Sequence, residues 1–348
     1  MKRVTITTVA KELGLSVCTV NKAMYGKPRI SEATRQRVLE AAERLGYRPN
    51  RLARALSRNP FSVGVVYPDA WPSHYGLLVQ GVHRGFDDLR DHHVTAVYEP
   101  CPSFDDGRVF AREVNAALRR SPSGLILAFG YARPDDYRRI AATVADEKVP
   151  CVLLGGDVPG MPRLSVVWHD TRRCGAMAAE VLSWLAPGEP VALLVGRLGS
   201  PDHDNKIEGF RAEAARAGLP VAAVVETFDD PDAGVPATQR LLAEHPEVKG
   251  IYVSSENGAG TGRFLRDCGL VGKVKVVATG IAPEIRAFVS TGVFQCSVYQ
   301  NQHLQGRRAV QALYAYLESG MQPEPEILVP PVLMQRANLD LFADLVGA

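Results

Sequence analysis

The sequence predicts an all-α head of three short helices, followed by a two-lobed α/β body built on two parallel sheets. Residues 1–58 show helical patterns only and are strongly basic. From Phe61 onward, short β-branched runs alternate with helical patterns, which is typical of parallel strands joined by crossover helices. About nine such runs are too many for one small sheet, and 348 residues suffice for two or three domains. We therefore expect two similar halves with a cleft at the carboxyl ends of their strands.

Composition excludes several classes of protein. Apolar residues make up 46% of the chain, and no apolar run approaches the roughly 20 residues of a membrane span. No apolar segment of a signal peptide follows Met1-Lys2-Arg3, so we expect a cytoplasmic protein. The six cysteines lie far apart without CxxC spacing, which predicts reduced thiols and neither a disulfide framework nor a metal site or cofactor.

The charge is distributed unevenly along the chain. Residues 1–58 hold 13 Lys and Arg against 4 Asp and Glu, whereas the remainder holds 27 against 34. The head is therefore expected to bind a polyanion, and the body is not.

Local signals place the helices of the head. Thr7 or Thr8 is expected to cap the first helix, and Ser16 to cap a second helix over about 17–25. Ser31 is expected to cap a third helix. The apolar positions expected to face a shared core are Val9, Ala10, Leu13, Val20, Met24, Val38, Ala41, Ala42 and Leu45.

A short basic segment follows the head. Pro49 stops helix continuation, and Asn50 can cap two turns on which Leu52 and Leu56 lie at i and i+4. Two turns are too few to be stable alone in water, so we expect this helix to form only with a partner.

The body should contain alternating strands and helices. Crossover helices are expected at 75–90 and 206–217, and Trp184, in a helical pattern over 178–185, is expected in the core. The expected strands are SVGVV, VTAVY, GLILAF, VPCVLL, PVALLV, AAVVE, GIYVSS, VKVVATG and FQCSVY.

Taken in this order, the head, the basic segment and the body resemble the LacI/GalR family of bacterial transcription regulators over essentially the whole chain. The body matches loosely, in Lys206-x-x-Gly209-Phe210, Glu256-Asn257, Thr279-Gly280 and Val298-x-Gln300-Asn301. The head matches specifically, in Val9-Ala10, Gly14-Leu15-Ser16, Thr19-Val20, Ser31, Thr34-Arg35, Val38, Ala41-Ala42, Leu45-Gly46-Tyr47-x-Pro49-Asn50 and Ala53-x-x-Leu56.

The resemblance implies a domain plan and a function. It implies a helix-turn-helix DNA-binding domain at 1–47, a hinge helix at 48–60 and a periplasmic-binding-protein-like effector domain at 61–348. The N-lobe would comprise about 61–166 and 301–326, and the C-lobe about 167–299 and 328–348. The implied function is a nucleoid-associated homodimeric repressor of carbohydrate-utilisation genes that binds a pseudopalindromic operator under the control of a small sugar or polyol. The effector either releases the protein from DNA or recruits it, and release is the commoner outcome in the family.

A helix-turn-helix places the start of its second helix in the major groove. Lys22 can donate to guanine, and Val17 and Cys18 can lie against thymine methyl groups, although both also suit plain helix packing. The resemblance makes these three the specificity positions. The full set of expected groove contacts is Ser16, Val17, Cys18, Thr19, Asn21 and Lys22, and phosphate contacts are expected from Thr5, Thr7, Thr19, Tyr25, Arg29, Ser31 and Arg51.

The resemblance also implies that two hinge helices pair over the operator centre. Leu56 would then insert between base steps in the minor groove with Arg54 beside it, which matches the way apolar wedges kink DNA. The alternative is that Leu56 packs onto the body of its own chain.

Candidate effector contacts lie where the family binds its ligands, and together they indicate a sugar or polyol. Trp71 is expected to stack on the ligand, whereas Trp168 could equally belong to the core. Lys206 stands where many relatives have Arg, and Ala282 replaces a usual Asp, so the ligand of a relative cannot be assumed. The candidates are Asp69, Trp71, His74, Tyr75, Trp168, Asp204, Lys206, Glu256, Asn257 and Gln300.

The sequence fits two other classes of protein less well. An enzyme is not expected, because 269–273 lacks the spacing of a phosphate loop, no GxSxG motif occurs, and His92-His93 is an isolated pair expected to face solvent. A solute-binding protein would explain the body but not the basic head.

Overall fold

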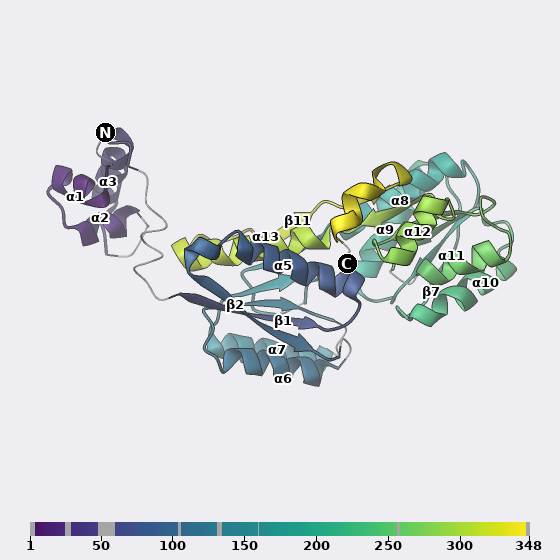
Figure 1. The fold of residues 1–348 in the computed structure, drawn as a ribbon, viewed down its shortest axis with the longest axis horizontal. Coiled ribbons are helices and arrows are strands. Elements are labelled where there is room, and N and C mark those ends of the chain that lie inside the picture. The colour runs from purple at the N-terminus through teal and green to yellow at the C-terminus, as the bar shows by residue number, and fades with distance from the viewer. Residues whose placement is uncertain are drawn as a thin grey trace.

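The computed structural model describes residues 4–24, 29–47, 60–103, 106–130, 134–158, 160–255 and 258–345 (Figure 1). The described part of the head consists of α1 (Ile6–Leu13), α2 (Val17–Met24) and α3 (Glu32–Arg44). These helices enclose a small core in which Val9, Val20 and Val38 are fully buried. Three short amphipathic helices therefore stabilise one another, as the apolar spacing predicts.

The helix caps of the head agree with the sequence at two of three positions. Ser16 accepts a hydrogen bond from the backbone N–H of Thr19 at 3.0 Å, and Ser31 accepts one from Thr34 at 3.2 Å. The first cap is Thr5, not Thr7 or Thr8, because Thr5 and Thr8 bond each other's backbone N–H in a reciprocal capping box. The first helix therefore begins at Ile6, earlier than expected.

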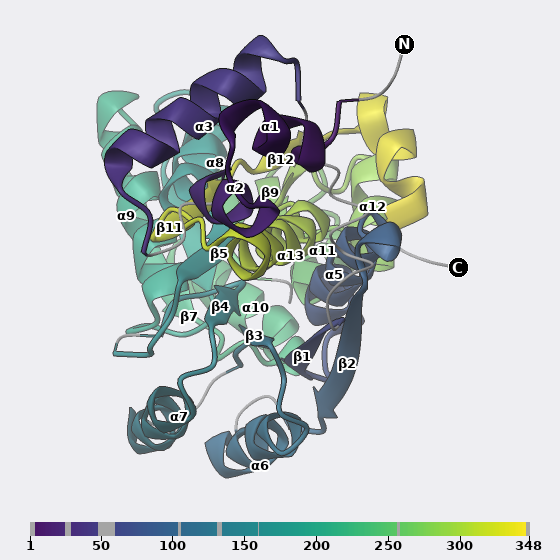
Figure 2. The same ribbon diagram turned by 90° about the vertical axis from the view of Figure 1, so that its left-hand side faces the viewer.

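The first lobe is a parallel six-stranded sheet in the order β11-β5-β4-β3-β1-β2. Helices α5 (Leu77–Asp87) and α13 (Gln302–Ser319) cover one face, and α6 (Gly107–Leu118) and α7 (Pro134–Glu147) cover the other (Figures 1 and 2). The strands are β1 (Phe61–Pro68), β2 (Val94–Cys101), β3 (Gly124–Ala128), β4 (Cys151–Leu154), β5 (Ser165–His169) and β11 (Glu326–Val329).

The second lobe repeats this plan in the order β12-β10-β9-β8-β6-β7, with β12 antiparallel to β10. Helices α8 (Thr171–Leu185) and α9 (Pro201–Arg216) cover one face. The other face carries α10 (Gly234–Glu244), α11 (Gly258–Asp267) and α12 (Pro283–Thr291). The strands are β6 (Val191–Val195), β7 (Val221–Glu226), β8 (Gly250–Val253), β9 (Lys275–Thr279), β10 (Cys296–Tyr299) and β12 (Val332–Met334).

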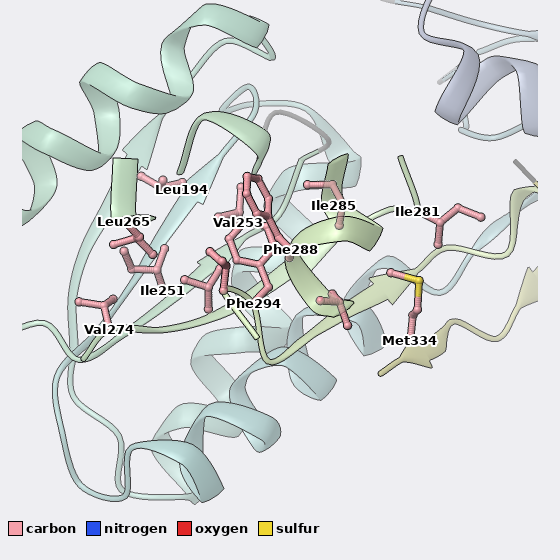
Figure 3. Close-up of a cluster of buried hydrophobic side chains, with 14 of the residues drawn as sticks. Leu194, Ile251, Val253, Leu265, Val274, Ile281, Ile285, Phe288, Phe294 and Met334 are labelled. Carbon is pink, nitrogen blue, oxygen red and sulfur yellow. The ribbon is translucent and has the colours of Figure 1, made fainter. Parts of the chain in front are cut away.

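The core beneath α11 and α12 shows how the second lobe is closed. Figure 3 shows Leu194, Ile251 and Val253 of the central strands beside Ile285 and Phe288 of α12. All five are at most 5% exposed, as expected for parallel strands covered on both faces. The predicted fold class, a helical head followed by two α/β lobes, is confirmed.

Some expectations within the body were wrong. Strands β5, β11 and β12 were not predicted, and β11 and β12 are edge strands in which only the last residue of each is buried. The first sheet continues to His169 and Val329, beyond the expected crossovers near 166 and 326. The expected helices at 75–90 and 206–217 are confirmed as α5, which follows a π-helical turn over Pro72–Gly76, and as α9, which begins earlier, at Pro201.

Two single residues also differ from expectation. The side chain of Trp184 is 67% exposed rather than buried, because it lies on the outward face of α8. His92 does not simply face solvent, since its Nδ1 lies 2.9 Å from the Tyr314 hydroxyl.

Candidate DNA-binding surface and interlobe cavity

The N-terminal end of α2 is open to solvent. Val17 is 43% exposed and Cys18 is exposed, whereas Val20 is completely buried beneath them. Asn21 and Lys22 are partly exposed on the same helix. A short helix that buries one side and presents Val17, Cys18 and Lys22 on the other has the form of a recognition helix.

The hydroxyl groups of the head already hold its helices in place. Thr5 takes part in the capping box of α1, and the Ser16 hydroxyl lies 2.8 Å from that of Thr19. Thr7, Arg29 and Ser31 are exposed, so their side chains are accessible to a phosphate backbone. The remaining predicted DNA contacts, Tyr25, Arg51, Arg54 and Leu56, lie outside the described residues. All these DNA contacts stay predictions.

A cavity of about 550 Å³ lies between the lobes. Asp69 and Asp204 do not line it, and Asp204 instead accepts a hydrogen bond from the Gly199 N–H at 3.1 Å. Glu256 and Asn257 lie outside the described residues. The structure brings six of the predicted effector residues to this cavity: Trp71, His74, Tyr75, Trp168, Lys206 and Gln300.

Aromatic side chains form the first-lobe wall of the cavity. Trp71 and Tyr75 stack with their ring centroids 6.3 Å apart, and the Tyr75 hydroxyl donates to the Phe129 carbonyl at 3.2 Å. Trp168 is only 8% exposed, and its indole N–H donates to Glu326 at 2.8 Å. Trp168 therefore offers a ligand only its ring surface, while Trp71 is half-buried at the wall of the cavity.

The second-lobe side of the cavity is polar and includes a buried ion pair. Lys206 is 1% exposed, and its Nζ lies 2.6 Å from Asp202 Oδ2 and 3.3 Å from the Ser254 carbonyl oxygen. His169 Nε2 lies 3.0 Å from Asp202 Oδ1. Burial disfavours the carboxylate form of Asp202, but Lys206 and His169 outweigh that effect and hold its pKa well below the usual value. Burial lowers the pKa of His169, so this ring is neutral at pH 7.

Glutamine side chains connect this ion pair to the first lobe. Gln300 Nε2 lies 3.1 Å from His169 Nε2, and Gln302 Nε2 donates to Gln300 Oε1 at 3.0 Å. Gln302 Nε2 also lies 3.3 Å from His74 Nδ1 on the first lobe. A continuous chain of polar contacts therefore crosses the hinge from His74 to Lys206.

The close crossing of α8 and α9 positions Lys206. A Cβ atom on Gly175 of α8 would lie 1.9 Å from the Lys206 carbonyl oxygen, so only glycine allows the two backbones to approach this closely. The reciprocal position is Gly209 of α9, whose Cβ would lie 1.9 Å from the Arg172 carbonyl oxygen. This contact fixes α9 relative to the cavity.

Sequence reasoning did not find several residues of the cavity. His169 and Asp202 are central to its polar side, and Arg197, His203 and Asp229 also line it. The only available signal was the i, i+4 spacing of Asp202 and Lys206 at the start of a helical pattern. His169 is the last residue of β5, a strand that was not predicted.

The described ranges contain no group of His, Cys, Asp and Glu side chains that could hold a metal ion. Within the same ranges, no helix has the length and hydrophobicity needed to cross a bilayer.

Two family models match the chain. Residues 5–50 match the model described as bacterial regulatory proteins, lacI family, and residues 75–321 match the model of the periplasmic binding protein domain. The first match covers the helical head, and the second lies within the two-lobed body.

Curated proteins with similar sequences include transcription regulators. Catabolite control protein A of Priestia megaterium is 28% identical over 74% of this chain and 75% of its own length. The maltose regulon regulatory protein MalI of Escherichia coli is 27% identical over 73% of this chain and 72% of its own length.

Similar solved structures resemble the body. A solute-binding protein of Burkholderia graminis in complex with D-arabinose has a TM-score of 0.72 at 21% identity, covering 81% of this chain and 97% of its own. A periplasmic ribose ABC transporter protein of Conexibacter woesei has a TM-score of 0.72 at 23% identity, covering 84% and 96%. These likenesses show the fold of the body.

Proposed function

We propose that this chain, which belongs to the lacI family of bacterial regulatory proteins, is a repressor of carbohydrate-utilisation genes controlled by a sugar-like effector. The observation that carries the proposal is the combination of two sites in one chain. The head carries a short helix, Val17–Met24, with an exposed N-terminal end, and an aromatic and polar cavity lies between two lobes of the periplasmic-binding-protein fold. The names of the relatives, which include catabolite control and maltose regulon proteins, support carbohydrate genes as the target.

The DNA half of the proposal rests on the head. Lys22, Val17 and Cys18 read base edges in the major groove, and Thr7, Arg29 and Ser31 contact phosphates. Residues 48–60 act as a hinge helix that forms on the operator, with Leu56 inserted in the minor groove.

Pairing of hinge helices requires a homodimer. The edge strand β2 supports a two-fold contact, because it has a neighbour on one side only. Tyr98 of β2 stacks on the exposed His83 of α5 with ring centroids 4.1 Å apart, which places an aromatic patch beside this edge. Two heads related by a two-fold axis bind the half-sites of a pseudopalindrome, and the dimer acts in the cytoplasm on the nucleoid.

The effector half rests on the cavity, and we assign no catalytic activity to it. The ring faces of Trp71 and Trp168 suit the apolar faces of a sugar, and the opposite side supplies Asp202, Lys206 and Gln300. A ligand bound across the cleft favours one angle between the lobes. Only its different affinity for the two angles shifts the DNA-binding equilibrium, and a coupling of about 1–3 kcal/mol is typical.

The proposal is tested by DNA binding with and without sugars. Duplexes selected from a random pool by the full-length protein should converge on a pseudopalindrome, and binding, measured by fluorescence anisotropy, should weaken when the effector is added. Removal of residues 1–58 should abolish DNA binding and leave ligand binding intact. Ligand binding without any sequence-specific DNA binding by the full chain would instead support a solute-binding protein.

A further inference from the structure

The cations of the interlobe cavity are already balanced by carboxylates. Lys206 pairs with Asp202 at 2.6 Å, and Arg163 holds Asp157 through two hydrogen bonds of 2.8 Å. Arg197 lines the same cavity as Asp229. Arg163 itself does not line the cavity, so the described lining holds two cationic side chains, Lys206 and Arg197, and three carboxylates, Asp157, Asp202 and Asp229. The described wall therefore carries no excess positive charge for an anionic ligand.

Carboxylates surround the start of the helix that begins at the cavity. Helix α9 starts at Pro201, and its first turn contains Asp202 and Asp204. The Gly199 N–H donates to Asp204 at 3.1 Å, and the Leu198 N–H donates to Glu226 at 2.8 Å. Carboxylates therefore take two backbone N–H groups just before the helix N-terminus, and their negative charge would repel an anion there.

The polar atoms that remain at the cavity suit hydroxyl groups. The Asp202 carboxylate only accepts hydrogen bonds, so a ligand group beside it must donate. His169 Nδ1 and Ser254 Oγ are buried, and neither has a hydrogen-bond partner among the residues that the structure describes. Both residues line the cavity. A hydroxyl group can donate to one of these atoms and accept from another, whereas a phosphate at neutral pH chiefly accepts.

We infer that the effector is an uncharged polyol that binds through its hydroxyl groups at Asp202, His169 and Ser254, and that its phosphorylated form is rejected. The inference rests on the proposed function, because it concerns the ligand of the same cavity. It excludes sugar phosphates as effectors of this chain.

The test compares matched pairs of ligands on the full-length protein. Isothermal titration measures the affinity for D-glucose and D-glucose 6-phosphate, D-ribose and D-ribose 5-phosphate, D-galactose and D-galactose 1-phosphate, and myo-inositol and its 1-phosphate. At least one unphosphorylated compound should bind, and its phosphate should bind at least about tenfold more weakly, a difference of 1.4 kcal/mol. Ser254→Ala should weaken binding of that compound by about two- to tenfold, as expected for one lost hydrogen bond. Ser183→Ala is the matched control, since its hydroxyl bonds the Glu180 carbonyl within α8, and should leave the affinity unchanged.

The outcomes separate this inference from the proposed function. Tighter or equal binding of a phosphorylated compound would overturn the inference and leave a sugar-controlled regulator in place. Failure of both members of every pair to bind, with sequence-specific DNA binding intact, would overturn the inference together with the effector half of the proposed function. Equal affinities of Ser254→Ala and Ser183→Ala would remove Ser254 from the site.

Discussion

Replacing Asp202 by Asn would leave the ammonium group of Lys206 buried without its counterion. Lys206 is 1% exposed and lies 2.6 Å from Asp202, while Asp202 itself is 27% exposed. Breaking a buried ion pair by removing one partner costs about 3–5 kcal/mol. An upper limit follows from proton release, because an ordinary lysine needs about 4.6 kcal/mol to lose its proton at pH 7. Since Asp202 keeps some contact with water, we expect a loss of about 3 kcal/mol, a large fraction of the 5–15 kcal/mol typical of a folded protein.

The measurement is urea unfolding of the full-length protein, followed by circular dichroism and Trp fluorescence. The stability of Asp202→Asn should recover as the pH rises from 7 to 9, because proton release from the buried amine then costs less. The double variant Asp202→Asn/Lys206→Met should lie within about 1 kcal/mol of the natural protein, since an apolar side chain needs no counterion. Asp204→Asn, a carboxylate in the same turn without a lysine partner, serves as control and should change little. The single variant Lys206→Met is measured alongside. If the double variant loses as much stability as Asp202→Asn and Lys206→Met together, the ion pair does not couple these residues and the reasoning fails.

Further predictions concern the head, the helix crossing and the response to acid. Lys22→Ala should relax base preference at one position of each half-site in a selection from random duplexes, and an unchanged preference would exclude its assigned contact. Leu56→Ala should weaken binding to the selected operator far more than binding to unrelated DNA, whereas equal losses would contradict insertion between base steps. Gly175→Ala should destabilise the second lobe by about 1–3 kcal/mol in urea unfolding, because the new Cβ would overlap the Lys206 carbonyl oxygen; a neutral effect would show that the crossing relaxes freely. Burial lowers the pKa of His169, so the unfolded chain binds more protons below about pH 6.5, and stability should fall as the pH drops through that range. His169→Gln should make this part of the pH profile flatter, and an identical slope would assign the acid sensitivity to other groups.

The sequence alone was sufficient for the head. Its caps, breaks and apolar spacing are local signals, and Ser16 and Ser31 cap the helices that the sequence predicts. The one error, Thr5 in place of Thr7 or Thr8, arose because three threonines lie within four residues and each can cap. Only the reciprocal bond between Thr5 and Thr8 decides between them.

In the body, the sequence determined the alternation of strands and helices and hence the two parallel sheets, because a buried parallel strand is a continuous apolar run that can be read locally. It also indicated Trp71, Tyr75, Lys206 and Gln300 as residues near a cleft, although through a family resemblance rather than through their own spacing. It could not indicate His169, which ends a short strand. The contact that makes His169 part of the cavity's polar side is with Asp202, 33 positions away in the chain. Only the tertiary structure decided that Asp202 neutralises Lys206, that Asp69 and Asp204 lie off the cavity, and that Trp184 faces solvent. The physical reason is that secondary structure follows from neighbours in the chain, whereas the charge and hydrogen bonding of a cavity between two lobes depend on segments that only the hinge crossings bring together.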